Sequence, residues 1–218
     1  MRPSTLSHLF SVALALLVAG PLAASPLLET DPAVHQAERS LRAAELRDLD
    51  ETATALYRRA SEQAQAILKR NPNSPGANFV FFAANGRLLL ADGLTKNLFA
   101  LRNLDKNHLD RAIELDPNYA NALAAKGGVL LDLPTLIGGD PDEGLKLLRR
   151  ANQLNPSGVG TRVSLAKALA RHGKFDEARR QARLAAHHAC MQRRRKALDD
   201  ASKILGELES PVARAGLH

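Results

Sequence analysis

The sequence predicts an all-α fold, built as a short array of helical repeats, and three observations support this prediction. The strong helix formers Ala, Leu and Arg dominate a composition that is 45% hydrophobic. Signals for β-strands are nearly missing, because the longest β-branched or aromatic run, residues 79–82, lies inside an Ala-rich helical pattern. The third observation is an internal repeat, in which the end of a helix is followed by Asp-Pro or Asn-Pro.

The repeat is clearest where Leu109-Asp-Arg-Ala-Ile-Glu-Leu-Asp-Pro117 aligns with Leu148-Arg-Arg-Ala-Asn-Gln-Leu-Asn-Pro156. An earlier copy ends at Pro72, so successive prolines are 45 and 39 residues apart. Proline lacks the amide donor that a helix interior needs, and each copy therefore marks the end of one helix and the start of the next. Repeated helical units of this length predict a solenoid.

The C-terminal unit is the most regular one. Ala166 and Ala178 are twelve residues apart across the Gly173 turn, and small residues at both positions allow two antiparallel helices to approach closely. These positions resemble the tetratricopeptide repeat (TPR) pattern, and Gly144 and Ala178 are separated by 34 residues, the length of that repeat. We therefore predict a right-handed helical-repeat superhelix of about three irregular TPR-like units plus flanking helices.

Capping signals mark the helix starts. Asp31-Pro32, Ser74-Pro75 and Asp140-Pro141 each combine a side-chain cap with proline at the first helical position. Five extra residues at 133–137 lengthen the middle unit, and about eleven near 94–104 lengthen the unit before it. The predicted helices are one or two over 32–70 and others over 75–92, 95–115, 118–132, 141–154, 159–171, 174–188 and 191–208.

The first residues have the pattern of a cleavable secretory signal. Arg2 is followed by an apolar stretch over 9–19, which is too short for a comfortable transmembrane helix, and cleavage is expected after Ala24. The predicted divisions are a signal peptide at 1–24, a helical-repeat domain at 25–210 and a frayed tail at 211–218. We expect a periplasmic or secreted chain, which contacts the membrane only if the signal segment stays uncleaved.

The charge and cysteine content restrict the function classes. The formal charge is +7, but basic residues alternate with acidic ones and no basic platform with aromatic side chains is present, which argues against a nucleic-acid partner. The run Arg193–Lys196 is expected on a solvated helix face. A single cysteine, Cys190, excludes an internal disulfide framework, and its small thiol is expected to be buried.

One loop resembles a more specific family. Leu131-Asp-Leu-Pro-Thr-Leu-Ile-Gly-Gly-Asp140 is similar to the Leu-Pro…Gly-Gly-Asp turn in the T component of tripartite ATP-independent periplasmic (TRAP) transporters, as are the segments that follow it. The resemblance covers roughly residues 55–208. It implies a periplasmic repeat protein that associates with a solute-binding protein and often forms homo-oligomers. Independently of family, Gly138 and Gly139 suit positive φ values, and Asp140 suits the cap of the next helix.

The repeat register predicts a concave binding groove lined by the first helix of each pair. An apolar strip edged by cations and one amide would suit an extended peptide or an acidic surface, and equally an amphipathic small anion. The predicted groove residues are Phe79, Arg87, Asn121, Leu131, Val163, Lys167 and Arg171. Each also has a structural explanation, since Phe79 is typical of a core and cations of a solvated helix. A general cell-envelope adaptor that binds a peptide or acidic partner is the alternative with the same fold.

Signals for catalysis are weak. Gly127-Gly128 and Gly138-Gly139 lack the Lys-Ser/Thr continuation of a phosphate loop, so we expect no catalytic residues and no cofactor. The third hypothesis is a small metal-binding protein or metallo-hydrolase that uses His187, His188 and Cys190. Adjacent helical residues point about 100° apart, which argues against their convergence on one ion.

Overall fold

The computed structural model describes residues 31–47 and 49–209, and every regular element within them is helical. The predicted signal peptide and frayed tail lie outside the described residues. The elements, in chain order, are α1 (Pro32–Glu45), α2 (Glu51–Arg70), α3 (Pro75–Ala91), α4 (Leu94–Leu104), the π-helical η1 (Asp105–Leu109), α5 (Asp110–Leu115), α6 (Ala120–Asp132), the 3₁₀-helical η2 (Thr135–Ile137), α7 (Pro141–Leu154), α8 (Val159–Arg171), α9 (Phe175–Met191) and α10 (Arg195–Glu209).

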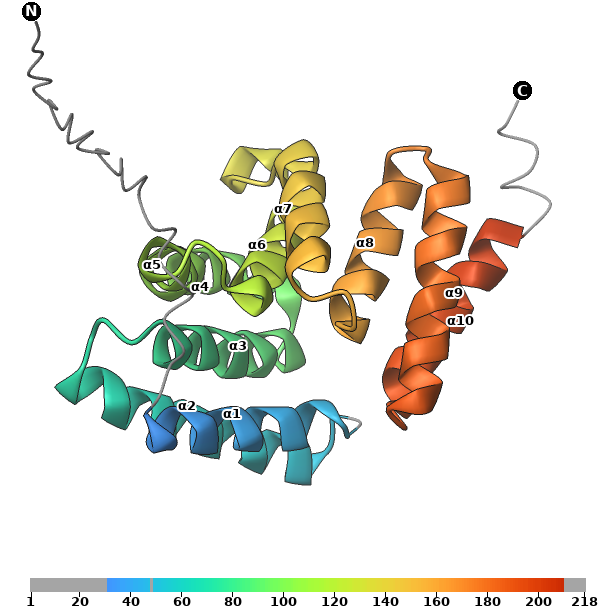
Figure 1. Cartoon of the computed structure of the whole chain (residues 1–218). Helices are drawn as coiled ribbons and strands as arrows, with labels where there is room; N and C mark the ends of the chain where they lie inside the picture. Colours follow the sequence, from blue (N-terminus) through green and yellow to red (C-terminus); the bar gives the residue numbers. More distant parts are fainter. Residues whose placement is uncertain (1–30, 48, 210–218) are drawn as a thin grey trace, which may run out of the picture.

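The helices form antiparallel pairs that stack along the chain (Figure 1). The pairs are α1/α2, α3 with the continuous helix α4–η1–α5, α6/α7 and α8/α9, and α10 packs on the last pair. The first helices α1, α3, α6, α8 and α10 each contact the next in that series. The all-α repeat prediction is confirmed, and the predicted N-terminal flanking helices form a full pair of their own.

The turn between successive pairs has the same geometry in its three copies. The C-cap of the helix before it is Asn71, Asp116 or Asn155. Their φ values are −141°, −138° and −133°, and their ψ values are 86°, 93° and 81°. The proline that follows each of these residues cannot donate to a helix, so the chain turns there. The backbone carbonyl of each accepts the amide three residues later, at 3.0 to 3.3 Å. The repeat inferred from the prolines is thus a repeat of backbone structure.

A side chain near the end of each second helix reaches back to the start of its first helix. This contact links the two helices of each antiparallel pair at the end opposite their connecting loop. The four hydrogen bonds are Arg70 Nη2 to Asp31 Oδ2 at 2.6 Å, Arg111 Nη2 to Asn73 Oδ1 at 2.6 Å, Arg150 Nη2 to Asn118 Oδ1 at 2.8 Å and Gln192 Nε2 to the Ser157 carbonyl at 3.2 Å.

Small residues set the distance between the helices of the later pairs. A Cβ added to Gly127 on α6 would lie 2.8 Å from the Gly144 carbonyl on α7 and 2.7 Å from Leu148 Cγ. In the last pair, Ala166 and Ala178 are both fully buried, as the repeat pattern predicts. Close packing of this kind leaves no room for an added methylene.

The buried side chains form two clusters, one over the N-terminal pairs and one over the C-terminal pairs. The first extends from α1 to α6 and includes Leu109, and the second extends from α6 to α10 and includes Leu148 and Leu169. Helix α6 belongs to both, since Ala122 lies in the first cluster and Leu131 in the second. This helix therefore joins two packing regions.

The predicted caps are present. Asp31, Ser74 and Asp140 each accept a hydrogen bond from a backbone amide in the first turn of α1, α3 and α7, at 2.8, 3.1 and 3.0 Å. Two predicted boundaries at the C-terminal end were wrong, because α9 continues to Met191 and α10 starts at Arg195.

The Gly-Gly-Asp turn depends on its two glycines for different reasons. Gly138 has a φ of +95°, as predicted, whereas Gly139 does not have a positive φ. A Cβ on Gly139 would instead overlap the carbonyl group of Leu133, so close backbone approach requires a glycine there. The turn is closed by the Asp140 amide, which donates to the Leu130 carbonyl at 2.9 Å.

The α9–α10 junction corrects two expectations. Cys190 is exposed on the last turn of α9, so its thiol is not part of the core. Arg193 and Arg194 lie in the turn and not on a helix face, and Arg193 has a φ of +53°. Over the part of the chain that the structure describes, no helix is both long enough and apolar enough to cross a bilayer.

Candidate functional site

The predicted groove residues divide into a buried set and an exposed set. Phe79, Leu131 and Val163 are 9%, 9% and 7% exposed. Phe79 packs edge-on against Tyr119 with ring centroids 5.2 Å apart. These three side chains therefore pack mainly within the protein and do not form the exposed apolar strip that the repeat register suggested.

The polar members of the predicted groove are exposed, and they lie on three successive first helices. Arg87 lies on α3, Asn121 on α6, and Lys167 and Arg171 on α8. Arg87 is close enough to lower the pKa of the Tyr57 phenol, although burial of that phenol has the larger effect and raises its pKa. Neither Arg87 nor Lys167 forms an ion pair with another described residue.

Arg171 has structural partners in α6. Its Nη1 donates to the Leu131 carbonyl at 2.6 Å, and its Nη2 pairs with the Asp132 carboxylate at 3.0 Å. The guanidinium thereby satisfies one of the unpaired carbonyls at the C-terminal end of α6. Asp132 also places one negative charge beside Arg171 on this face.

An ion cluster around the buried Asp105 carboxylate joins the second and third helix pairs. Lys126 on α6 donates to both carboxylate oxygens of Asp105, at 2.9 and 2.8 Å, and lies 2.7 Å from Asp110. The π-helical turn, which closes with the Asp110 amide on the Asp105 carbonyl, holds one residue more than an α-helical turn. Residues five apart therefore share one side, and a single ammonium reaches both carboxylates. The helix predicted over 95–115 is present, and the π-helical turn within it was not predicted.

The Asp105 side chain is fully buried, and this environment opposes its charge. Burial raises the pKa of the Asp105 carboxyl, while the hydrogen bonds and positive charge of Lys126 act in the opposite direction. Arg102, whose guanidinium is 3.8 Å from Asp105, also lies against Gly138 of the long loop. The cluster therefore connects the π-helical turn, α6 and the loop, and we assign it a structural role.

An amide-lined pocket of about 340 Å³ lies between α3 and the α4–η1 helix. Phe81, Asn85 and Leu89 line it from α3, and Asn103, Asn107 and His108 line it from the other helix. None of its lining residues carries an Asp, Glu, Lys or Arg side chain. On α3, Asn85 lies two residues from Arg87, a rotation of about 200° around an α-helix. The pocket therefore opens on a different side of α3 from the predicted groove.

The hydrogen bonds around His108 define its tautomer. Asn78 is buried, and its Nδ2 donates to the Pro72 and Ser74 carbonyls at 3.0 and 2.9 Å, so its Oδ1 must accept the bond from His108 Nδ1 at 3.0 Å. Burial lowers the pKa of His108, which favours the neutral imidazole. The proton is therefore on Nδ1, and Nε2 has a free lone pair.

The sequence carries a signal for this pocket that our prediction missed. Asn85, Leu130 and Leu169 each lie thirteen residues after a repeat proline. Leu130 and Leu169 are 7% and 1% exposed and fill the space between paired helices. An amide at the equivalent position of α3 breaks the apolar pattern of the repeat, and a polar residue at a core position is a recognised sign of function.

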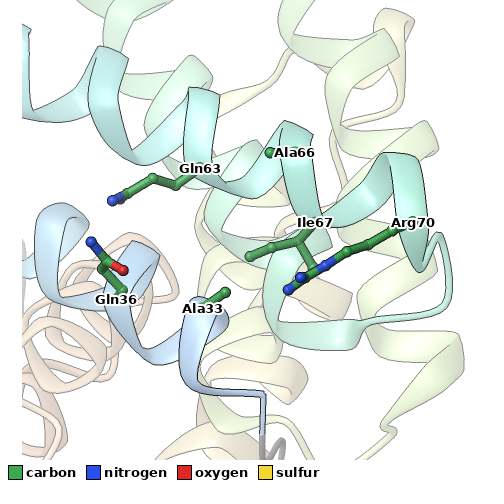
Figure 2. Close-up of a pocket in the computed structure, with 6 residues that line it drawn as sticks. All are labelled: Ala33, Gln36, Gln63, Ala66, Ile67 and Arg70. Atoms are coloured by element: carbon green, nitrogen blue, oxygen red, sulfur yellow. The ribbon is translucent and has the colours of Figure 1, made fainter.

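A second, smaller pocket of about 200 Å³ lies between α1 and α2 (Figure 2). Ala33, Ala66 and Ile67 form its apolar wall, and Gln63 accepts a hydrogen bond from Ser40 at 2.9 Å. Arg70, at one end, is paired with the Asp31 cap. Since its cation is already neutralised and one of its two amides, Gln63, is partnered, this pocket is the weaker candidate.

The metal-binding hypothesis loses its geometric support. The rings of His187 and His188 are 5.7 Å apart at an interplanar angle of 66°. Among the described residues, no three His, Cys, Asp or Glu side chains come together as a metal site would require. Cys190 is therefore not part of such a group.

Comparisons with known proteins identify the architecture. No protein-family model and no curated protein matches the chain. A thermophilic TPR protein from Thermus thermophilus has a TM-score of 0.50 and 21% sequence identity over 79% of this chain and 88% of its own. MamA has a TM-score of 0.43 and 16% identity over 78% of this chain and 99% of its own. YrrB, described as a TPR protein with an unusual peptide-binding site, has a TM-score of 0.40 and 20% identity over 80% of this chain and 85% of its own.

At 21% identity, the similarity to the Thermus protein is informative about the fold alone. It agrees with the repeated turns, the stacked antiparallel pairs and the small residues between paired helices. The chain has a TPR-like helical-repeat fold.

Proposed function

We propose that the chain is an exported scaffold that binds an acidic surface of a protein partner through its first helices. The observation that carries the proposal is the exposure of Arg87 and Lys167, which have no ion-pair partner among the described residues and lie on α3 and α8. Cations that are not neutralised within the protein are free to pair with carboxylates of a partner. Asn121 on α6, between them in the series of first helices, adds an exposed amide.

Export and the class of partner are proposed from the sequence. Residues 1–24 have the pattern of a secretory signal, from which we propose a periplasmic location. The loop that ends in Gly138-Gly139-Asp140 resembles the T component of TRAP transporters, which supports a solute-binding protein as the partner.

Capture from a crosslinked cell-envelope extract tests the proposal. The bait is the chain from Ser25 to His218, compared with an Arg87→Glu/Lys167→Glu variant. Arg171 is left unchanged, because its bonds to Leu131 and Asp132 would confuse a binding defect with a packing defect. We expect wild type to capture a solute-binding protein and the variant to lose it.

The matched control reverses the same number of charges on a second helix. Arg58→Glu/Arg59→Glu changes two exposed arginines of α2 and should capture the partner as wild type does. Equal capture by the Arg87→Glu/Lys167→Glu variant would overturn the proposed surface. Specific capture of a different envelope complex would replace the transporter role with that of a general envelope adaptor.

A further inference from the structure

The amide-lined pocket between α3 and α4–η1 combines hydrogen-bonding groups that are not used inside the protein. Both N–H groups of Asn85 are occupied, since Nδ2 donates to Ser61 Oγ and to the Phe81 carbonyl at 2.8 Å each, which leaves Oδ1 as an acceptor. His108 contributes the lone pair of Nε2 as a second acceptor of fixed position. A ligand of this pocket must therefore bring hydrogen-bond donors.

Asn103 and Asn107 add groups that can both donate and accept. They are exposed, they line the pocket from one face of the α4–η1 helix, and no hydrogen bond to a described residue holds either carboxamide. They lie about one helical turn apart, and one turn of an α-helix rises about 5.4 Å. Alternate residues of an extended peptide are separated by a similar distance, roughly 6.6 Å. Each carboxamide can therefore pair with the N–H and C=O of alternate peptide residues.

The remaining lining of the pocket is apolar and uncharged. Phe81, Leu89 and Leu104 form the wall, and Phe81 packs against the His108 ring with centroids 4.5 Å apart. A carboxylate or phosphate would find no cation in this lining, and it would face the fixed acceptors on Asn85 and His108. An apolar side chain, in contrast, would be removed from water on entering.

We propose that this pocket binds an uncharged, extended segment of a protein partner, with peptide N–H groups on Asn85 and His108, main-chain pairing by Asn103 and Asn107, and one apolar side chain inside. The site is separate from the cationic surface of the first helices. It rests on the proposed scaffold function in one respect, namely that the ligand is part of a protein.

The test is a titration of the purified chain from Ser25 to His218 with a capped neutral peptide, acetyl-Ser-Ala-Leu-Ala-Ser-amide, followed by NMR of the side-chain carboxamides and imidazoles. We expect the signals of Asn103, Asn107 and His108 to shift together on one binding curve. The same peptide with an N-methylated leucine should bind at least ten-fold more weakly, because it lacks a main-chain donor at the centre.

Two variants and a control locate the site. Asn103→Ala/Asn107→Ala removes two exposed side chains that form no hydrogen bond with a described residue, so the fold should be preserved. The affinity for the peptide should fall at least ten-fold. Ala100→Trp, at an exposed position of the lining, should block the pocket and abolish binding. Gln153→Ala removes an exposed carboxamide of α7 and should bind the peptide as wild type does.

The outcomes separate this site from the cationic surface. The Arg87→Glu/Lys167→Glu variant should bind the neutral peptide normally, so the two proposals fail independently. The pocket proposal is overturned if no pocket signal shifts at millimolar peptide, or if Asn103→Ala/Asn107→Ala binds as tightly as wild type. It is also overturned if glucose shifts these signals and the peptide does not, since the ligand would then be a small polyhydroxylated molecule.

Discussion

The last helix pair and the second helix pair share a repeat register but pack differently. Ten residues after its repeat proline, the last pair has Ala166, the third pair has Gly127 and the second pair has Phe82. Ala166 is fully buried against a partner helix rich in alanine, whereas Phe82 brings a large ring to the same register position. Small residues bring the two helices of the last pair into close contact. The second pair has the larger residue, and a pocket lies between its two helices.

The two pairs also differ in how their second helix is held. Helix α9 is continuous, and its Ala178, Ala182 and Ala185 are fully buried. The second helix of the second pair contains the π-helical turn, where Asp105 is buried against Lys126. The comparison shows that one repeat can be stabilised by close apolar contact and another by an ion cluster, and the second arrangement leaves polar side chains available for a ligand.

The largest predicted effect tests the ion cluster. Lys126→Met leaves the buried Asp105 without its main partner, and removal of one member of a buried pair costs about 3–5 kcal/mol. The free energy of unfolding, measured by urea titration, should fall by about that amount. Lys146→Met removes the exposed partner of Glu143, and its free energy of unfolding should stay close to that of wild type, because water screens an exposed ion pair. A similar loss in both variants would show that the cluster does not stabilise the second pair.

The next effect concerns the loop that packs beside the cluster. Gly139→Ala places a Cβ on the Leu133 carbonyl and should cost about 3 kcal/mol, the upper part of the range for overpacking. Gly160→Ala is the matched control, because open space surrounds that helical glycine and alanine favours a helix there. Thermal unfolding of both variants checks this contrast. Equal melting temperatures for the two would mean that the loop backbone is not held in close contact.

A smaller loss is expected in the closely packed last pair. Ala166→Leu should push α8 and α9 apart at a cost of about 2 kcal/mol, since added methylenes strain a packed interface. Ala66→Leu, at an exposed position of α2, should stay within about 0.5 kcal/mol of wild type. Urea titration of both variants measures the difference. A loss at Ala166 no larger than at Ala66 would contradict the close contact that defines this pair.

The smallest predicted effect is a pH dependence of the second pair. Burial lowers the pKa of His108 from its usual value of 6.5, so the unfolded chain binds a proton more readily than the folded one below about pH 7. Stability should therefore fall as the pH drops through 6.5 towards the pKa of folded His108. His108→Asn keeps a donor for Asn78 but does not titrate, and its stability curve should lack this component. A wild-type curve that matches the variant between pH 7.5 and 5.5 would contradict it.

The sequence was sufficient to predict the features that depend on local chemistry. Proline and the caps at Asp31, Ser74 and Asp140 determine helix starts within a few residues, so the helix order could be predicted. Periodic small residues such as Ala166 and Ala178 predicted the close pair. These signals act over one or two helical turns, which is the range that a pattern in a single sequence describes well.

The features that were missed depend on contacts between distant residues. Lys126 and Asp105 are 21 residues apart, and each alone has the appearance of an ordinary charge on a helix surface. The π-helical turn has no pattern of its own, so a plain helix was predicted there. The repeat register predicts on which side of a helix a residue lies, but not how neighbouring helices pack against that side. The predicted groove therefore included three buried residues, Phe79, Leu131 and Val163. Cys190 is exposed because it follows the buried Ala189 and points about 100° around α9 from the face that the alanines bury.

The central claim, that a partner binds the first helices, is tested most directly by mapping crosslinks in the captured complex. Lys167 is an exposed lysine of a first helix, whereas Lys69 and Lys146 are exposed on second helices. A lysine-reactive crosslinker followed by mass spectrometry should join Lys167 to the partner and leave the other two without such links. Crosslinks concentrated at Lys69 or Lys146, with none at Lys167, would contradict the proposed binding surface.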